Sequence, residues 1–253
     1  MLGLPFLCLA QELEPRRWSH LPTGTNFVGG GYSYTKADIF FDPVLRIEDV
    51  EMEMHTWALK YIRTFEMLQK SARVDFIQGY QEGRWTGLVD GVPSSIKRSG
   101  LSDSVLRFAI NLYGAPPLEG KEFQSYRERA DVETIIGTGL VVQLPTGDYM
   151  DDKLINLGTN RFTFRPQLGM VHNRGKWSVE LTGSVWLFTD NDDFFNGNEL
   201  EQDPLGGLAS DPGQLHEKVH LGRQPAPVTL DHSPGETDDA AGLGAEEAGG
   251  ADD

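Results

Sequence analysis

Several stretches of this 253-residue chain alternate between apolar and polar positions. In SVLRFAINLY, at residues 104–113, Leu106, Phe108 and Ile110 occupy every second position, and Arg107 lies between the first two. Successive side chains of a β-strand point to opposite faces, so this pattern predicts a strand with one apolar and one polar face. KWSVELTGSVWLF, at 176–188, alternates in the same way over its first half and places Glu180 on the polar side.

The stretch RFTFRPQLG, at 161–169, has the strongest contrast between its two sides. Arg161 and Arg165 alternate there with Phe162, Phe164 and Leu168. A soluble β-sandwich turns such an apolar face inward, whereas a membrane barrel turns it to lipid and turns the charges to a lumen. The peptide alone is compatible with both.

The same reasoning predicts seven strands, near residues 25–35, 54–66, 70–79, 103–113, 133–144, 160–172 and 176–189. The second is ambiguous, because apolar residues between 50 and 68 also fall at helical spacing. We favour a strand there, since the neighbouring segments alternate. The links after the first, third, fifth and seventh strands are long and those after the second and sixth are tight, which is typical of outer-membrane barrels. The fourth link breaks this rhythm, and its portion Lys121–Ala130 is expected to form a short helix at the periplasmic mouth.

Composition removes several classes of protein. No run of about 18 apolar residues occurs, which excludes a conventional transmembrane helix. The formal net charge of -16 argues against a nucleic-acid partner, because phosphate binding needs clustered Lys and Arg. Cys8 is the only cysteine, so the chain has no intrachain disulfide and no cysteine-based metal site.

The two ends of the sequence differ from its middle. Residues 1–10, MLGLPFLCLA, resemble the end of a secretory signal but lack its basic start, so we interpret them as a signal-peptide remnant. Residues 206–253 contain no Phe, Trp, Tyr or Ile and are rich in Gly, Ala, Asp and Glu. Such a segment cannot bury enough apolar surface to offset its ordering entropy, and it is predicted to be a disordered acidic tail. The β-domain is therefore expected to cover residues 11–205.

Longer motifs resemble a known family. They are INLGTNRFTFRPQLGMVH (155–172), ELTGSVWLFTDNDDFF (180–195), LEQDPL (200–205) and EPRRWSHLPTGTN (14–26). Together they resemble bacterial outer-membrane transporters associated with the meta-cleavage pathway of phenol degradation. The resemblance covers roughly residues 11–205 and implies a single-domain β-barrel with a signal peptide, which passes small, aromatic compounds across the outer membrane of a Gram-negative bacterium.

The sequence departs from this family after residue 205, where further aromatic strands are expected. Those strands are missing or lie in a shifted reading frame, a hypothesis that sequencing the locus tests. Bacterial single-chain barrels have an even number of strands, so seven strands and a stub predict an incomplete barrel that does not close unless it oligomerises. The predicted fold class is thus an all-β, antiparallel transmembrane-type β-barrel, apparently incomplete, with a disordered acidic tail.

The candidate functional residues are charges in the middle of predicted strands. An arginine facing lipid near the bilayer midplane costs about 2–4 kcal/mol, so in a barrel these charges must line the lumen. The expected lumen-lining residues are Arg73, Asp75, Arg107, Arg161, Arg165 and Glu180. The expected lipid-facing residues are Leu106, Phe108, Ile110, Phe162, Phe164 and Leu168. The alternative is that opposite charges pair and simply fill a narrow pore.

No motif for catalysis or cofactor binding is convincing. Residues 216–220, HEKVH, match the zinc-protease pattern but lie in the acidic tail without a surrounding core, and the acidic loop at 189–203 does not fit a calcium-binding loop. We predict no catalytic residue, no metal and no cofactor. The sequence predicts a non-enzymatic outer-membrane channel or transporter for small hydrophobic or aromatic compounds, with outer-membrane lipid and the solute as partners. The alternative is a secreted soluble β-barrel or sandwich that binds an apolar ligand.

Overall fold

The computed structural model describes residues 17–39 and 46–214, all of which belong to one compact unit of the chain. Its long strands are β1 (Asn26–Ile39), β2 (Ile47–Met67), β3 (Lys70–Val89), β4 (Val92–Leu101), β5 (Ser104–Tyr113), β6 (Val132–Leu144), β7 (Thr163–Arg174), β8 (Trp177–Phe188) and β11 (Leu205–Gln214). The shorter elements are helix α1 (Gly120–Arg129), strands β9 (Asn191–Phe194) and β10 (Asn198–Leu200), and the one-turn helix η2 (Phe195–Gly197). The all-β prediction is confirmed, and so is a helix in the fourth link.

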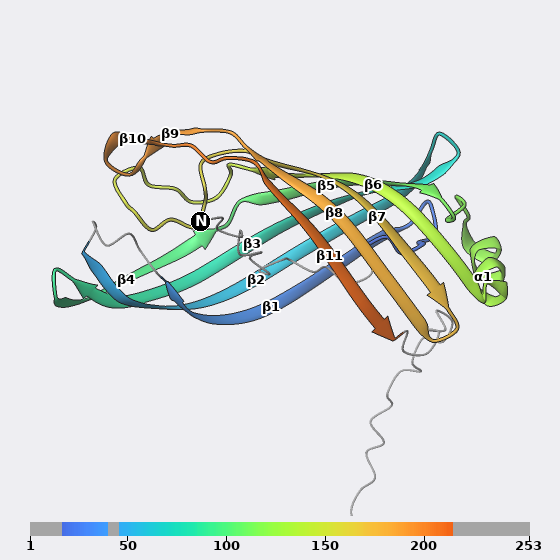
Figure 1. The fold of residues 1–253 in the computed structure, drawn as a ribbon, viewed down its shortest axis with the longest axis horizontal. Coiled ribbons are helices and arrows are strands. Elements are labelled where there is room, and N and C mark those ends of the chain that lie inside the picture. The colour runs from blue at the N-terminus through green and yellow to red at the C-terminus, as the bar shows by residue number, and fades with distance from the viewer. Residues whose placement is uncertain (1–16, 40–45, 215–253) are drawn as a thin grey trace, which may run out of the picture. The chain divides into compact units, whose positions relative to one another are not determined.

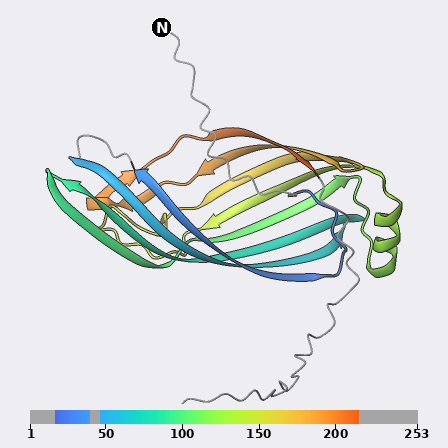
Figure 2. The same ribbon diagram turned by 90° about the horizontal axis from the view of Figure 1, so that it is seen from below.

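The long strands form one antiparallel sheet in the order β1-β2-β3-β5-β6-β7-β8-β11, with β4 paired to the far end of β3. Figures 1 and 2 show these strands side by side, with α1 beyond one end of them. We call that end the α1 end and the opposite one the loop end, because the connections 145–162 and 189–204 lie there. β1 and β11 are the edges of the sheet, and no pairing joins them among the residues described.

Tight turns determine much of this order. Leu68 and Gln69, with φ of 53° and 59°, close the hairpin between β2 and β3. Asp90 and Gly91, with φ of 50° and 76°, close the one between β3 and β4. Two consecutive residues with positive φ match the right-handed twist of a hairpin, and Asp-Gly is a favoured pair for such a turn. The sheet is therefore built mainly from neighbours in the sequence.

The ambiguous segment at 50–68 lies within β2, a strand of 21 residues, so the strand interpretation is confirmed. Its helical spacing is overridden because β1 and β3 pair with it along almost its whole length.

The ladder between β7 and β8 has a gap. Phe164 is opposite Leu187 and Gln167 is opposite Ser184, but the ladder skips the two β7 residues between them, Arg165 and Pro166. Proline has no N–H to donate, which explains the gap.

The two faces of the sheet differ in chemistry. One face, the polar face, carries Asp75 opposite Arg107, and Arg107 is in turn opposite Val141, which is opposite Arg165. The other face, the apolar face, carries the neighbouring residues of the same strands, such as Phe76 opposite Leu106. Asp75 and Arg107 are 0% and 4% exposed, whereas Leu59 and Leu168 are 57% and 59% exposed. The polar face is thus buried and the apolar face is exposed, the reverse of a soluble β-sandwich.

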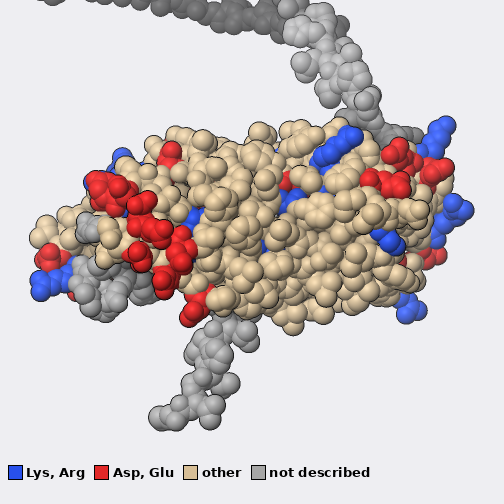
Figure 3. Space-filling model, turned by 90° about the horizontal axis from the view of Figure 1, so that it is seen from above, with Lys and Arg blue, Asp and Glu red and all other residues tan. Residues whose placement is uncertain are grey.

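Charged residues are unevenly spread over the surface drawn in Figure 3. Lys, Arg, Asp and Glu gather toward the two ends of that face, and mostly uncharged atoms lie between them (Figure 3). None of the described helices is long and apolar enough to cross a membrane.

Three strand regions differ from the sequence-based expectation. β4 was not anticipated, because PSSIKRSG within it is polar and does not alternate. The hairpin β9–β10 interrupts the acidic loop. β11 continues past the expected end of the domain at residue 205, so that boundary is too early. Backbone hydrogen bonds to β8, which need no large side chains, explain how LGGLASDPGQ extends the sheet. The expected signal remnant 1–10 and the rest of the tail, 215–253, lie outside the described residues.

Candidate functional site

A cluster of charges lies at the centre of the polar face. The Asp75 carboxylate is within 3.5 Å of Arg73 Nε, 3.7 Å of Arg107 Nη1 and 3.8 Å of Lys60 Nζ. The strand register explains the cluster, since Asp75 is opposite Arg107 on β5 and is two residues from Ile77, which is opposite Lys60 on β2. One buried carboxylate therefore faces three cations, and opposite charges at this spacing compensate part of the cost of their desolvation.

The N-terminal segment before β1 packs on this polar face through Trp18, which is 1% exposed. Trp18 Nε1 donates a hydrogen bond to Thr182 Oγ1 at 2.9 Å on β8. Arg107 Nη2 donates to the Arg17 carbonyl oxygen at 3.2 Å, and the Arg107 guanidinium lies 5.7 Å from the centre of the indole ring. The charged cluster and the N-terminal segment are therefore physically connected.

The sheet has a notch where the indole lies. A Cβ atom added at Gly169 on β7 or at Gly137 on β6 would overlap the Trp18 ring. These two glycines are directly opposite each other in the ladder. The sequence reasoning did not identify Trp18 as a site residue. The available signal was a pair of glycines at polar-face positions of two neighbouring strands, where close approach of another group is the usual reason for glycine.

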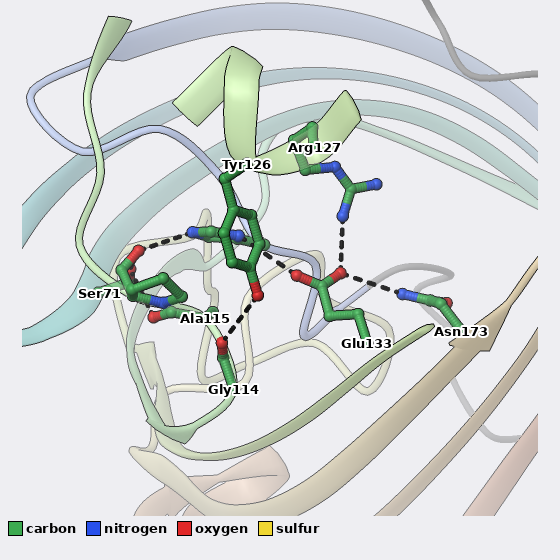
Figure 4. Close-up of polar contacts among 9 residues, drawn as sticks. Ser71, Gly114, Ala115, Tyr126, Arg127, Glu133 and Asn173 are labelled. Carbon is green, nitrogen blue, oxygen red and sulfur yellow. Dashed lines mark hydrogen bonds and ion pairs between the residues drawn. The ribbon is translucent and has the colours of Figure 1, made fainter. Parts of the chain in front are cut away.

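Polar contacts around Glu133, the second residue of β6, join several elements at the α1 end (Figure 4). Arg127 of α1 donates to Glu133 Oε2 at 2.6 Å, and Asn173 of β7 donates to the same oxygen at 3.4 Å. His20 of the N-terminal segment places Nδ1 3.3 Å from Glu133 Oε1 and Nε2 2.7 Å from the Pro116 carbonyl oxygen. One carboxylate thus joins the helix, the N-terminal segment and two strands.

Further contacts fasten the link between β5 and α1 to the same end. Ser71 Oγ donates to the Ala115 carbonyl oxygen at 3.0 Å, and Tyr126 Oη donates to the Gly114 carbonyl oxygen at 3.4 Å. Burial is the main cause that raises the pKa of Tyr126 above its ordinary value, and the negative charge of Glu133 adds to it. The hydroxyl therefore stays protonated and remains a donor. The helix is held in place by polar contacts at several points.

The loop end is organised by Asp103, which is 7% exposed. Its carboxylate accepts hydrogen bonds from Gln143 Nε2 at 2.9 Å, the Gly147 N–H at 2.9 Å and the Thr159 hydroxyl at 2.7 Å. Hydrogen bonds to an ionised carboxylate are stronger than bonds between neutral groups. Asp103 therefore holds the loop 145–162 against the turn between β4 and β5. Asn191 has the same role for β9, because its side chain contacts Asn160 and Tyr149.

The expected lumen-lining residues are brought together only in part. Arg73, Asp75 and Arg107 form the central cluster described above. Arg165 lies on the same face, 5.3 Å from the ring centre of Trp186, and Glu180 is 8% exposed on β8, opposite Val171. Arg161 precedes β7, so its expected position within a strand is wrong; its side chain donates to Gln202 and lies 4.7 Å from the ring centre of Phe188.

The expected lipid-facing residues also vary in their surroundings. Leu106 and Leu168 are exposed on the apolar face, at 37% and 59%. Phe108 and Ile110 share that face by alternation, but Ile110, which is opposite Ala72, is only 8% exposed. Phe162 lies before β7 and stacks on Phe164, with ring centres 6.0 Å apart. Among the described residues, no group of three or more His, Cys, Asp or Glu is placed to hold a metal ion. The HEKVH motif at 216–220 lies outside them.

The sequence matches a protein-family model described as "Putative MetA-pathway of phenol degradation" over residues 43–239. The match covers most of the chain, so the protein belongs to this family, and the resemblance drawn from its motifs is confirmed. The matched range also continues beyond residue 205. No curated protein sequence matches the chain.

Among solved structures, the fold is similar to an outer membrane channel from Pseudomonas putida F1. The two share 23% sequence identity with a TM-score of 0.56, and the alignment covers 78% of this chain and 68% of that one. The likeness shows that the antiparallel sheet has the architecture of part of a channel barrel.

Proposed function

We propose that this protein is an outer-membrane β-barrel channel or transporter for small hydrophobic or aromatic compounds, and not an enzyme. The observation that carries the proposal is the reversed polarity of the sheet. Burying Asp75 and Arg107 while leaving Leu59, Leu168 and Leu208 more than half exposed is unfavourable in water. It is favourable when lipid covers the apolar face, because the hydrocarbon then removes that surface from water.

Under this proposal the polar face lines the lumen and the apolar face contacts lipid. Arg73, Asp75, Arg107, Arg165 and Glu180 then set the electric field of the solute path. Leu106, Phe108, Ile110, Phe164 and Leu168 belong to the wall of the barrel. Family membership and the likeness to a bacterial channel support this arrangement. Export through the secretory route, with residues 1–10 as part of the signal, is included in the proposal.

The lengths of the strands support a position for the membrane within the sheet. A transmembrane β-strand needs about 9–11 residues, whereas β2 and β3 have 21 and 20. The apolar face of β1 and β2 changes character toward the loop end, where Lys36 Nζ pairs with Glu51 at 2.7 Å. Tyr32 and Trp57 lie on the α1 side of that ion pair, with ring centres 5.5 Å apart. Aromatic residues gather at membrane interfaces, so we place the outer interface near this pair and the loop end outside the cell.

The test is whether the full chain behaves as a membrane barrel. We expect it in the outer-membrane fraction, with a heat-dependent shift in mobility on SDS gels. Vesicles containing it should take up benzyl alcohol faster than vesicles that contain the heat-denatured protein. Recovery of folded protein in the soluble periplasmic fraction would contradict the proposal and favour a soluble protein that binds an apolar ligand.

A further inference from the structure

His20 attaches the N-terminal segment before β1 to the α1 end through both nitrogens of its ring. Nε2 lies 2.7 Å from the Pro116 carbonyl oxygen, and Nδ1 lies 3.3 Å from Glu133 Oε1. Both side chains are buried, with 0% of His20 and 3% of Glu133 exposed. Since both groups are shielded from bulk water, the protonation of the ring decides whether each contact attracts or repels.

Only a doubly protonated ring suits these two partners. A carbonyl oxygen can only accept a hydrogen bond, so Nε2 has to carry a proton. Arg127 Nη1 lies 2.6 Å from Glu133 Oε2, and this cation holds the carboxylate in its ionised form, so Nδ1 faces a negative charge. At 3.3 Å the second contact is a charge–charge contact and not a well-aligned hydrogen bond. Either neutral tautomer of His20 would turn a lone pair toward one of the two oxygens.

The groups around the imidazole come from several elements, and Glu133 is the only carboxylate among those described. Phe123 and Tyr126 of α1 pack on the ring edge to face, with ring centres 4.9 and 5.1 Å away. The charged and titratable groups that face the pair are Arg127 and the protonated Tyr126 of α1, and β3 and β7 contribute the neutral Ser71 and Asn173. The charge on the ring is therefore balanced through Glu133.

The segment has room to move on the polar face. Ser19 and Leu21 line a cavity of about 310 Å³, part of which is open solvent, and Thr64, Ser71 and Asn111 of β2, β3 and β5 are among its other walls. The segment is attached on either side of this cavity lining by Trp18 and His20. Under the proposed function the polar face lines the lumen, so the segment lies beside the path of the solute.

We propose that the His20–Glu133 pair is a proton-dependent attachment that keeps the channel narrow at the α1 end, an inference that rests on the proposed channel function and adds its regulation. While the ring is an imidazolium, the pair joins the segment to β6 and, through Arg127, to α1. When the ring loses its proton as the pH rises, the Nδ1 lone pair faces the carboxylate and the attraction becomes a repulsion. The segment is then released at this end. Histidine ordinarily changes charge between about pH 5 and about pH 8, so the pH at the periplasmic mouth controls the opening.

Nitrogen-15 NMR of histidine-labelled protein in lipid vesicles tests the protonation directly. The chain has six histidines, so the signals of His20 are identified by their loss in His20→Gln. At about pH 5 both ring nitrogens of His20 should carry a proton, and at about pH 8 Nδ1 should have lost its proton. A His20 ring that is neutral at both pH values, or charged at both, overturns the inference whether or not the protein conducts.

Conductance of the full chain in planar bilayers tests the opening. The open probability should rise by at least about tenfold between about pH 5 and about pH 8, because a buried ion pair that loses one charge becomes strongly unfavourable. His20→Gln and Glu133→Gln should each remove this pH dependence. His172→Gln is the matched control, because the Nδ1 of His172 lies 2.8 Å from the neutral Thr134 hydroxyl near the same end of the sheet, and it should retain the full response.

The outcomes separate this inference from the channel function. Equal open probability of the unaltered chain at the two pH values, or a response that survives in His20→Gln, overturns the inference and leaves the channel function intact. Absence of conductance at both pH values contradicts the channel function itself, and the NMR result then still decides the protonation of the pair. Variants are compared only if they keep the heat-dependent shift on SDS gels, and Glu133→Gln takes the place of His20→Gln if the latter does not fold.

Discussion

The two faces of the sheet are made by the same strands, yet the polar side chains of one face are buried and the apolar side chains of the other are exposed. On the polar face Asp75 is fully buried among Arg73, Arg107 and Lys60. On the apolar face, Phe76, the very next residue, is 37% exposed. The difference shows that the surroundings decide which face must be covered. Under the proposed function, a bilayer outside the sheet keeps water from Leu168, while Arg165 faces the lumen.

The largest expected effect comes from breaking the charge cluster on the polar face. Asp75→Asn leaves Arg73, Arg107 and Lys60 close together without their carboxylate. Removing one partner of a buried ion pair typically destabilises a protein by about 3–5 kcal/mol. We expect a loss of that order in the free energy of unfolding, measured in lipid vesicles by urea titration. Asp90→Asn, which removes an exposed pair with Arg46, is the control and should have no detectable effect.

On the apolar face, the corresponding test introduces a charge. Leu168→Arg should destabilise the protein in a bilayer by about 2–4 kcal/mol if this position lies near the midplane. Val132→Arg places the same charge at the start of β6, beside the α1 end, where the cost falls to about 0–1 kcal/mol near an interface. Equal effects of the two substitutions would show that Leu168 is not deep in lipid.

A smaller effect is expected from filling the notch that holds Trp18. Gly169→Ala puts a methyl group into the indole, and overpacking of this kind costs about 1–3 kcal/mol. Gly183→Ala, on the apolar face of β8, has its nearest atom at 3.9 Å and should be tolerated. Trp fluorescence of the folded protein checks the displacement, since only the first variant should move Trp18. A normal Trp18 spectrum in Gly169→Ala would disprove the proposed fit.

The smallest effect concerns the hydrogen bond between Trp18 and Thr182. Trp18→Phe retains an aromatic ring but loses the N–H donor and should cost about 0.5–1.5 kcal/mol from that bond, in addition to the lost ring volume. Thr182→Val removes the acceptor, and the double variant measures the coupling between them. Additive losses would mean that the bond contributes nothing to the attachment of the N-terminal segment.

Local patterns determined a large part of the fold. The alternation in SVLRFAINLY and its neighbours predicted β5, β7 and β8, because a strand repeats every two residues and its faces can be read directly. Elements whose formation depends on a partner strand could not be predicted from their own sequence. β4 and β11 have weak patterns and exist because the ladders of β3 and β8 offer hydrogen-bonding edges.

The same division holds for the candidate site. The mid-strand charges Arg73, Asp75 and Arg107 could be identified because a charge on an alternating strand has to face something other than lipid. Their meeting point could not be identified, since it depends on the register between β2, β3 and β5, and a shift of one residue would reverse every face. The role of Trp18 could not be predicted either, because the notch that holds it is formed by glycines far away in the sequence.

The sequence by itself determined that this is an all-β chain with one charged and one apolar side to its strands. It also carried the family resemblance in its motifs. Only the tertiary structure decided which side is buried, because burial depends on the curvature of the sheet and on the segment that packs against it. The structure likewise decided that Trp18 and His20 attach that segment to the polar face, through contacts with Thr182 and Glu133 that span more than a hundred residues of sequence.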